Sequence, residues 1–348
     1  MPATHSPHEE RSASSADGLA SACETAASET AVVGVLNATA GPHASSIPLM
    51  RPESVDNPLQ VRWRYAIGIP AVHLLAALAF LPQFFSWTGV AAAIVGLYVF
   101  GTLGINLCYH RLLTHQGFVV PKRLEHALAV LGVCTLQDTP ACWVAMHRIH
   151  HKHSDERPDP HSPLVSFLWG HCGWLMFANR EFLNLNHYQR FTRDLLRDPF
   201  YLRLERGGCW LWIYLASAAL FFLGGCGVGV LLDGSRQAAL HMGASLLVWG
   251  VFVRTVLTWH ITWSVNSLTH VWGYRNYETT DNSRNNVLVG LWSNGEGWHN
   301  NHHADQRAAA HGHRWWEFDL TWLTIRLLER IGLARDVVRP RVWTAAGP

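Results

Sequence analysis

Histidines are frequent in this chain, and many of them stand in short motifs. The sequence of 348 residues holds 22 histidines. Three motifs place them close together: HRLLTH at residues 110–115, HRIHH at residues 147–151 and HNNHH at residues 299–303. In the two HxxHH motifs, positions i, i+3 and i+4 put three imidazoles on one face of a helix. The neutral nitrogens of such a face can hold one transition-metal ion or bridge two.

A fourth motif and the spacing of the first extend this candidate metal site. In TWSVNSLTH, His270 lies four residues after Asn266 and eight after Thr262, so the three share a helical face. His110 and His115 are five residues apart, about 140° around an α-helix, and converge only if the helix ends or bends. Together the motifs supply nine imidazoles, more than the four ligands of one tetrahedral zinc, and predict a two-metal centre. Imidazole binds Zn, Cu, Fe and Ni, so the ligand type alone does not identify the metal.

The elements that position these histidines are predicted to be membrane-spanning helices. Hydrophobic residues make up 49% of the chain and charged residues only 15%, whereas roughly a quarter of a soluble protein is charged. No Asp, Glu, Lys or Arg occurs from Tyr65 to Tyr109, and proline and polar residues interrupt this run at Leu81–Gly89. A backbone in lipid must satisfy its own hydrogen bonds as a helix. We therefore expect four spans, at about residues 65–84, 87–107, 209–232 and 238–261.

The basic residues predict the orientation of these spans. The chain has 27 lysines and arginines. All of them except Arg236 and Arg254 lie in three segments: before the first span, between the second and third spans, and after the fourth span. The positive-inside rule places these three segments in the cytoplasm, and with them both termini and all the histidine motifs. Arg254 lies within the fourth span, so we expect its side chain to face protein or water rather than lipid. It is either a functional or structural polar anchor, or it forms a buried pair or snorkels to the membrane surface.

The predicted fold is an all-α integral membrane protein with four transmembrane helices and a cytosolic helical cap. The cap comprises residues 108–208 and 262–348, and the membrane domain as a whole comprises residues 61–348. Residues 1–60 form a tail rich in Ala, Ser, Thr, Gly and Pro, a composition that predicts disorder. The segment Trp315–Ile331 is predicted to be an amphipathic helix with Asp319 at its N-cap, packed on the cap or lying on the membrane surface.

Composition excludes several classes of function. The net charge of +2 gives no indication of nucleic-acid binding. The seven cysteines are scattered and form no CxxC motif, which excludes a disulfide framework and a thiolate zinc module. A metal site against lipid instead faces long alkyl chains, which offer nothing to hydrolyse except at the head. An oxygen-activating di-iron centre is therefore the favoured interpretation.

The motifs, their order and the spans between them resemble those of one enzyme family. HRLLTH, HRIHHKHSD, VNSLTH and NGEGWHNNHHA resemble the histidine motifs of membrane fatty-acyl desaturases of the stearoyl-CoA (Δ9) type. The resemblance covers about residues 61–335, and GEGWHNNHHA preceded by TDNSRNN is similar to bacterial members. It implies an enzyme of the bacterial inner membrane in which reduced iron and O₂ remove two hydrogens from an acyl chain. The products would be water and a cis double bond, expected at Δ9.

The same resemblance implies the ligands of two Fe²⁺ ions and no catalytic residue beyond those ligands. One iron would be held by His110, His115, His147, His150 and His302. The other would be held by His151, His270, His299 and His303, with Asn266 binding through a water. The two sets together use all nine histidines of the four motifs.

The resemblance also maps a tunnel for the acyl chain. The positions that bend the chain beside the metals match Gln137, Trp143, Thr262 and Trp263. Trp143 lies four residues before His147, so it shares a helical face with a predicted ligand. Tyr98, about 18 Å below His110 along the helix, matches the floor of the tunnel, with Thr102 one turn above it. Interfacial or core packing is the alternative role for these aromatic residues.

Carboxylates are expected beside the ligands, because a metal-bound imidazole usually donates its second N–H to one. Asp155, four residues after His151, and Glu296, three residues before His299, stand at helical spacing for this role. Further candidates are Asp159 and Asp281. Helix caps or surface charges are the alternative role of these acids.

Two departures from the family pattern concern the partners. Animal acyl-CoA desaturases have Arg-Asp immediately before the second motif, where this chain has Ala145 and Met146. An acyl-CoA and an acyl glycerolipid of the membrane are therefore both open as substrates. No HPGG-type haem motif occurs in the sequence, so electrons are expected from a separate ferredoxin, rubredoxin or b-type cytochrome. The basic cap suits an acidic donor and anionic headgroups.

Two other functions fit part of the pattern. A membrane di-iron hydroxylase has similar histidine motifs but inserts oxygen. The motifs NSLTH and GEGWHNNHH favour desaturation over hydroxylation. A non-enzymatic metal transporter or sensor would need polar ligands along a path at membrane depth. The motifs lie instead at the ends of the predicted spans.

Overall fold

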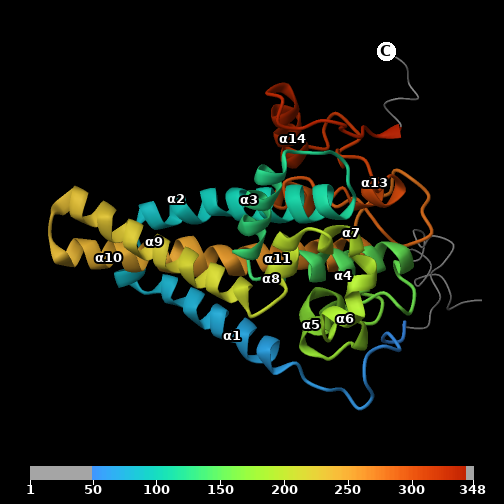
Figure 1. Ribbon diagram of the computed structural model, residues 1–348, viewed down its shortest axis with the longest axis horizontal. Coiled ribbons are helices and arrows are strands. Elements are labelled where there is room, and N and C mark those ends of the chain that lie inside the picture. The colour runs from blue at the N-terminus through green and yellow to red at the C-terminus, as the bar shows by residue number, and fades with distance from the viewer. Residues whose placement is uncertain (1–48, 342–348) are drawn as a thin grey trace, which may run out of the picture. The chain divides into compact units, whose positions relative to one another are not determined.

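The computed structural model describes residues 49–341, and the regular structure in that range is helical (Figure 1). Only isolated β-bridges, such as that between Val55 and Asn179, occur in this described part. The disorder predicted for residues 1–48 lies outside the described residues. Residues 49–60, the rest of the predicted tail, contact residues 164–180. There the N–H of Ala178 donates to the carbonyl of Gln60 at 2.8 Å.

Four helices are long and apolar enough to cross a membrane, as predicted. The first consists of α1 (Trp63–Ala77) with η1 (Leu78–Phe80), and the second of α2 (Trp87–Gly96) with η3 (Leu97–Thr114). The third is α9 (Cys209–Asp233). The fourth runs through α10 (Arg236–Leu247), η7 (Val248–Val253), α11 (Arg254–Ser267) and η8 (Leu268–His270).

Short breaks join these helices into two hairpins. Pro82 opens the turn η2 (Pro82–Phe84), and the Ser86 hydroxyl then caps α2 by accepting the N–H of Gly89 at 2.9 Å. The second hairpin turns at Gly234, whose φ of +74° suits a residue without a Cβ. Both breaks fall where proline, glycine and serine interrupt the apolar runs.

Small residues let the two helices of the second hairpin approach closely. A Cβ added at Gly229 of α9 would lie 2.4 Å from the carbonyl oxygen of Ala238 in α10. One added at Gly225 would lie 2.7 Å from the Cα of Gly243. In a membrane, where water does not drive helices together, such close backbone packing is a main source of helix association.

The second and fourth helices extend beyond their predicted ends. The second was expected to end at residue 107 and reaches Thr114, and the fourth was expected to end at residue 261 and reaches His270. Hydropathy ends a span where polar residues begin, but these polar residues are buried in protein and the helices continue through them. The extensions carry His110, Asn266 and His270.

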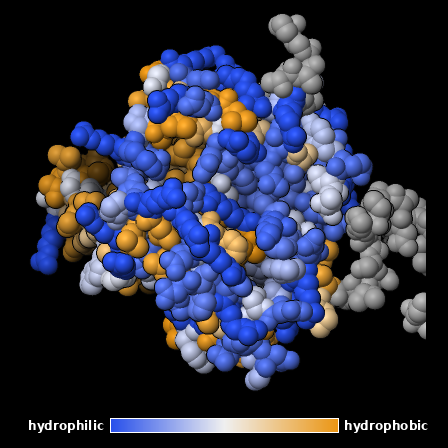
Figure 2. Space-filling model, turned by 45° about the vertical axis from the view of Figure 1, so that its right-hand side comes forward, coloured by the Kyte–Doolittle hydropathy of each residue, from blue (hydrophilic) through white to orange (hydrophobic). Residues whose placement is uncertain are grey.

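The remaining helices gather at the ends of the spans where the histidine motifs lie (Figure 1). On the face seen in Figure 2, hydrophilic residues cover most of this part, and hydrophobic residues gather where the spans recede. The longer helices here are α3 (Lys122–Val133), α4 (Pro140–His153), α12 (Val287–Trp292), α13 (His299–Ala304) and α14 (Leu320–Arg330). Short turns between α4 and α9 are η4 (Trp169–Gly173), α5 (Trp174–Met176), η5 (Arg180–Phe182), α6 (Leu185–Tyr188), η6 (Gln189–Phe191), α7 (Arg193–Leu196) and α8 (Pro199–Leu204).

Arg254 faces protein, as expected for a charge within a span. Its side chain is fully buried, and Nη1 donates to the carbonyl of Cys134 at 2.9 Å while Nε donates to the carbonyl of Gly250. The guanidinium also lies 4.1 Å from the centre of the Phe100 ring. Arg254 therefore connects α11 to the turn after α3 and to η3.

The predicted C-terminal helix is present as α14, and the Asp319 carboxylate caps it by accepting the N–H of Trp322 at 2.8 Å. Trp322 and Ile325 are buried against the rest of the protein. Leu323 and Leu327 of the same helix are about half exposed, at 50% and 57%. The helix thus both packs on the protein and presents a separate apolar edge.

Candidate metal centre

The structure brings the nine histidines of the four motifs into two adjacent groups. The first histidine group is His110, His115, His147, His151 and His302. The second histidine group is His150, His270, His299 and His303. Within each group, one ring nitrogen of every member lies within 4.8 Å of the others. The rings of His151 and His303, one from each group, have centroids 4.5 Å apart.

The predicted division of the histidines is wrong in one respect, because His150 and His151 are exchanged. On α4, His147 and His151 are one turn apart and their Nε2 atoms lie 3.0 Å from each other. His150 turns toward the other side, where its ring lies 5.2 Å from that of His270. Spacing places all three rings on one broad helical face. Only the packing of the neighbouring helices decides which ring meets which group.

The winding of η3 explains how His110 and His115 converge. This part of the helix has π-type turns, in which each N–H bonds the carbonyl five residues back. The N–H of His115 accordingly donates to the carbonyl of His110 at 3.1 Å. Residues five apart then lie above one another, and the two ring centroids are 4.8 Å apart. The expected 140° divergence is removed by a change of helix type rather than by a bend.

The distances between imidazole nitrogens fit metal ions with more than four ligands. The Nε2 of His302 lies 3.1 Å from that of His110 and 2.9 Å from that of His151. In the second histidine group, the Nε2 atoms of His270 and His299 are 3.1 Å apart. Two nitrogens about 2.1 Å from one ion are about 3.0 Å apart at a right angle and about 3.4 Å apart at a tetrahedral angle. The observed spacing is close to the first value.

Several buried ring nitrogens have no protein partner and are therefore available to an ion. They include Nε2 of His115 and Nε2 of His303. Burial lowers the pKa of His147, His151 and His302 well below that of free imidazole, and the neighbouring imidazoles lower it further. These rings are neutral at physiological pH, which is the state that coordinates metals.

Four carboxylates orient the rings by accepting a hydrogen bond from Nδ1. The pairs are His110 with Glu296 at 2.5 Å, His150 with Asp159 at 2.9 Å, His270 with Asp155 at 2.8 Å and His303 with Asp281 at 2.5 Å. An Nδ1–H donor leaves the Nε2 lone pair free, so each bond turns Nε2 toward its group. All four acids had been expected near the ligands.

The partners of two of these acids differ from those implied by helical spacing. Asp155 lies beyond the end of α4 with φ of +60°, so it no longer follows the helical face of His151 and reaches His270 instead. Glu296 precedes α13 and binds His110 from the second span rather than its near neighbour His299. Local spacing therefore identified the acids but not the rings that they hold.

Two residues at this site carried no role in the sequence analysis. Arg111, between the histidines of the first motif, is buried and donates to Glu296 at 2.8 Å and to Asp319 at 2.9 Å. His311 is also buried, with Nδ1 3.2 Å from Glu296 and its ring stacked on His302. The two carboxylates compensate the burial of the Arg111 charge. The acids at 296 and 319 were visible in the sequence, but their pairing was not.

Glu296 is held as a carboxylate by this arrangement. Burial alone would raise the pKa of Glu296, but the Arg111 guanidinium and the imidazoles of His311 and His110 hold it well below its usual range. A permanent anion at this position favours a proton on Nδ1 of His110.

A narrow cavity of about 60 Å³ reaches the first histidine group. It is lined by four predicted tunnel residues, a predicted metal neighbour and one member of the group: Gln137, Trp143, Thr262, Trp263, Asn266 and His147. The amide of Gln137 donates to the hydroxyl of Thr262 at 3.2 Å, and Trp143 stacks on His147 with centroids 5.0 Å apart. The structure thus gathers these residues beside the histidines.

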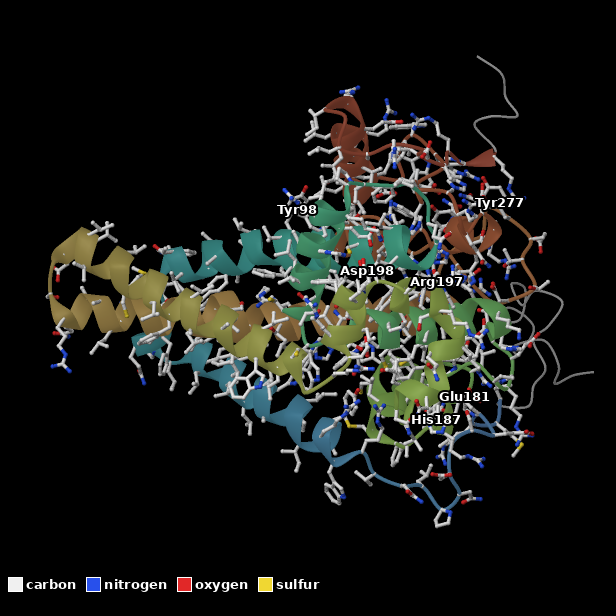
Figure 3. All side chains as sticks on the ribbon, in the orientation of Figure 1. Tyr98, Glu181, His187, Arg197, Asp198 and Tyr277 are labelled. Carbon is white, nitrogen blue, oxygen red and sulfur yellow. The ribbon has the colours of Figure 1, made fainter. Side chains whose placement is uncertain are left out.

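Tyr98 and Thr102 lie elsewhere. The hydroxyl of Tyr98 is 2.8 Å from that of Thr324 in α14, and Figure 3 shows Tyr98 on the side of the second span that faces this helix. The Thr102 hydroxyl accepts a hydrogen bond from Asn294 at 2.7 Å. Neither residue lines the cavity that holds the other tunnel positions. Their place at a tunnel floor stays a prediction.

Comparison with known proteins gives the family. The model of the fatty acid desaturase family matches residues 85–330. The chain is 42% identical to an sn-1 stearoyl-lipid 9-desaturase of Anabaena variabilis over 278 residues, 80% of this chain and 94% of the relative. It is 40% identical to an sn-2 palmitoyl-lipid 9-desaturase of Nostoc sp. (strain 36) over 288 residues, 82% and 93% of the two chains.

A third relative is named for a different substrate. The chain is 38% identical to an acyl-CoA C20 Delta5-desaturase of Anemone leveillei over 276 residues, 79% of this chain and 81% of the relative. A family model that spans most of this chain, and relatives of this identity over nearly their whole length, show that the protein belongs to the fatty acid desaturase family and is an oxidoreductase.

Proposed function

We propose that this protein is a Δ9 desaturase of glycerolipid-bound acyl chains that uses two iron ions, one in each histidine group. The names of the relatives from Anabaena and Nostoc support both the position and the lipid form of the substrate. The two groups of converging imidazoles, set beside an apolar cavity, are the observation that carries the proposal.

The residues of the chain have three tasks in this reaction. The nine histidines hold the two ions, with Asn266 beside the second through a water, and bound Fe²⁺ supplies the activation of O₂ and the abstraction of two hydrogens. The four carboxylates fix the tautomers and directions of the rings. Gln137, Trp143, Thr262 and Trp263 position the acyl chain and exclude water from the ions.

The surroundings of the second motif support a lipid substrate over an acyl-CoA. Ala145 and Met146 stand where animal acyl-CoA desaturases have Arg-Asp, and both are buried. Met146 lines the cavity. Neither side chain can form an ion pair or a charged hydrogen bond with the phosphates of coenzyme A, whereas both suit an alkyl chain.

Fatty-acid analysis tests this function. The chain is expressed with a ferredoxin and its reductase in a host that lacks Δ9 desaturation, beside His299→Ala and, as a control, His187→Ala. His187 is exposed and lies away from the site (Figure 3). We expect cis-monounsaturated chains with the double bond at carbon 9, esterified in glycerolipids, from the wild type and His187→Ala only. Hydroxylated chains, or the same product from His299→Ala, would contradict the proposal.

The separate electron donor is proposed to dock over a hollow beside the first histidine group. This hollow, of about 550 Å³, is lined by His115 and His151 and by the basic residues Arg148, Lys152 and Arg307. His115 and His151 are the half-buried edge of the group, so they offer a short route for electrons. A small acidic carrier such as a ferredoxin matches the basic rim. The distribution of lysine and arginine supports a cytoplasmic position for this face in a bacterial inner membrane.

Charge reversal at the rim tests the docking site. Lys152→Glu should lower the rate of reduction by ferredoxin by about tenfold at low ionic strength, through slower association, and the difference should shrink as salt is added. Arg335→Glu, an equally exposed basic position outside the hollow, is the matched control. Stopped-flow reduction kinetics measure both. Equal rates for the two variants would place the donor elsewhere.

A further inference from the structure

A second, larger cavity adjoins the narrow cavity beside the first histidine group. The second cavity has a volume of about 290 Å³ and lies between the beginnings of α1 and α9. The two cavities share five lining residues: Tyr65, Ile69, Leu136, Asp138 and Trp259. Ile69, Leu136 and Trp259 give the junction an apolar wall. The two cavities therefore adjoin, and together they outline a path from the beginnings of two spanning helices to Trp143 and His147.

The outer end of this path faces the space that lipid occupies. The second cavity is lined by Gly68, Ala71 and Val72 of α1 and by Leu211 and Leu215 of α9. Most of these residues are exposed, although both helices are candidate membrane spans. α1 packs against α11 and η7, and α9 packs against α10. In Figure 1, α1 runs apart from the packed pair of α9 and α10. The opening therefore faces outward between two candidate membrane spans.

A polar cluster stands where the two cavities meet. The Tyr65 hydroxyl donates to the Asp138 carboxylate at 2.5 Å and accepts hydrogen bonds from Arg62 at 3.0 Å and Arg64 at 2.8 Å. Arg64 lines the outer cavity, and its side chain is 55% exposed. Two guanidinium groups at the edge of an apolar opening can donate hydrogen bonds to ester, phosphate or sugar oxygens of a lipid headgroup.

We propose that the acyl chain of a bilayer glycerolipid enters sideways between α1 and α9, with its headgroup held at Arg62 and Arg64. This route rests on the proposed function, because it supplies the chain that the histidine groups desaturate. The apolar wall at Ile69, Leu136 and Trp259 receives the alkyl chain, which therefore never leaves an apolar environment. The bond between Tyr65 and Asp138 borders the passage and connects α1 to the turn before α4.

A substitution that fills the opening tests the route. Gly68 lines the outer cavity, and a Cβ added there meets no heavy atom within 4 Å, so the ring of Gly68→Trp is expected to occupy this cavity. Gly227→Trp is the matched control, because Gly227 also lies on a spanning helix with nothing within 4 Å of an added Cβ but does not line the cavity. Both variants are assayed as iron-loaded protein in nanodiscs of a stearoyl glycerolipid.

Gly68→Trp should reduce turnover by about tenfold or more, with unchanged iron content and melting temperature, and Gly227→Trp should match the wild type. If both variants matched the wild type while the wild type formed product, the route would be wrong and the desaturase function would stand. If the wild type formed no product with a competent donor, the function itself would fail.

A direct measurement keeps the route testable without activity. Nanodiscs containing a glycerolipid with a diazirine on its acyl chain are irradiated with the protein, and labelled peptides are identified by mass spectrometry. We expect labels in residues 64–72 and 210–215 and, deeper, at Trp143 or Met146. Gly68→Trp should remove the deep labels and Gly227→Trp should keep them. Deep labels that persist in Gly68→Trp would overturn the proposal.

Discussion

Four of the nine rings in the two histidine groups get their direction from a carboxylate elsewhere in the chain. Glu296 is the most connected of these, since it contacts His110, His311 and Arg111 together. Arg111 continues the network to Asp319, the cap of α14. One carboxylate therefore connects a ligand of the second span to the C-terminal helix. Loss of the Glu296 carboxylate is therefore expected to weaken metal binding without removing any ligand.

Replacing Glu296 by Gln should lower metal affinity or activity by about 10- to 100-fold, because the amide holds Nδ1–H of His110 less strongly and leaves Arg111 without an anion. Iron content after dialysis against a graded chelator series measures the affinity. Glu278→Gln, an exposed acid outside the network, is the control. Equal iron retention in the two variants would show that Glu296 does not orient the ligand.

At this scale the sequence predicts which residues gather but not how they pair. The nine histidines and four acids could be found because motif spacing and the resemblance point to them. The exchange of His150 and His151 could not, because both rings belong to one helical face and the choice depends on where α11 and α13 pack. The roles of Arg111 and His311 could not be predicted for a similar reason. The partner of Arg111 lies 185 residues away in the sequence, and His311 meets its partner only through the fold.

At the scale of elements, the helices that carry the site are longer than hydropathy indicates. The second and fourth spans run on through polar residues because protein, not lipid, surrounds their ends. Hydropathy did locate all four spans and the break at Pro82. It could not give the π-type winding of η3, which depends on the tertiary fit of His110 and His115.

The close packing of α9 and α10 gives a test at this scale. Gly229→Leu should destabilise the protein by about 1–3 kcal/mol or more, because its Cβ alone would lie 2.4 Å from the carbonyl of Ala238. Gly227→Leu, two residues away on the exposed side of α9, should be neutral. Thermal unfolding in detergent followed by tryptophan fluorescence compares them. A neutral Gly229→Leu would mean that the hairpin can separate at no cost.

At the scale of the whole molecule, the histidine groups join parts of the chain that are distant in sequence. Ligand positions come from η3, α4, η8 and α13, so two membrane hairpins and two cap helices meet at one place. The apolar edge of α14, with Leu323 and Leu327 exposed, lies on the outer side of the same assembly. Such convergence predicts that bound metal stabilises the entire fold.

Removal of iron should therefore lower the melting temperature of the wild type. An ion at about a thousand times its Kd contributes about 4 kcal/mol, which corresponds to roughly 5–7 °C for a chain of 348 residues. Differential scanning fluorimetry before and after chelation under reducing conditions measures the shift. His299→Ala should show a clearly smaller shift, because its second group is already impaired. An unchanged melting temperature in the wild type would show that the fold does not depend on the ions.

The sharing of helices between the two histidine groups has a consequence for how the protein acquires its metals. The two histidine groups share two short helices. α4 contributes His147 and His151 to the first group and His150 to the second. α13 contributes His302 to the first group and His299 and His303 to the second. The ion that binds first would restrict the motion of both helices, and the entropy lost in that step would not be lost again when the second ion binds. Loading is then positively cooperative, so a partly reconstituted sample consists mainly of empty and fully loaded molecules, with few that hold a single ion.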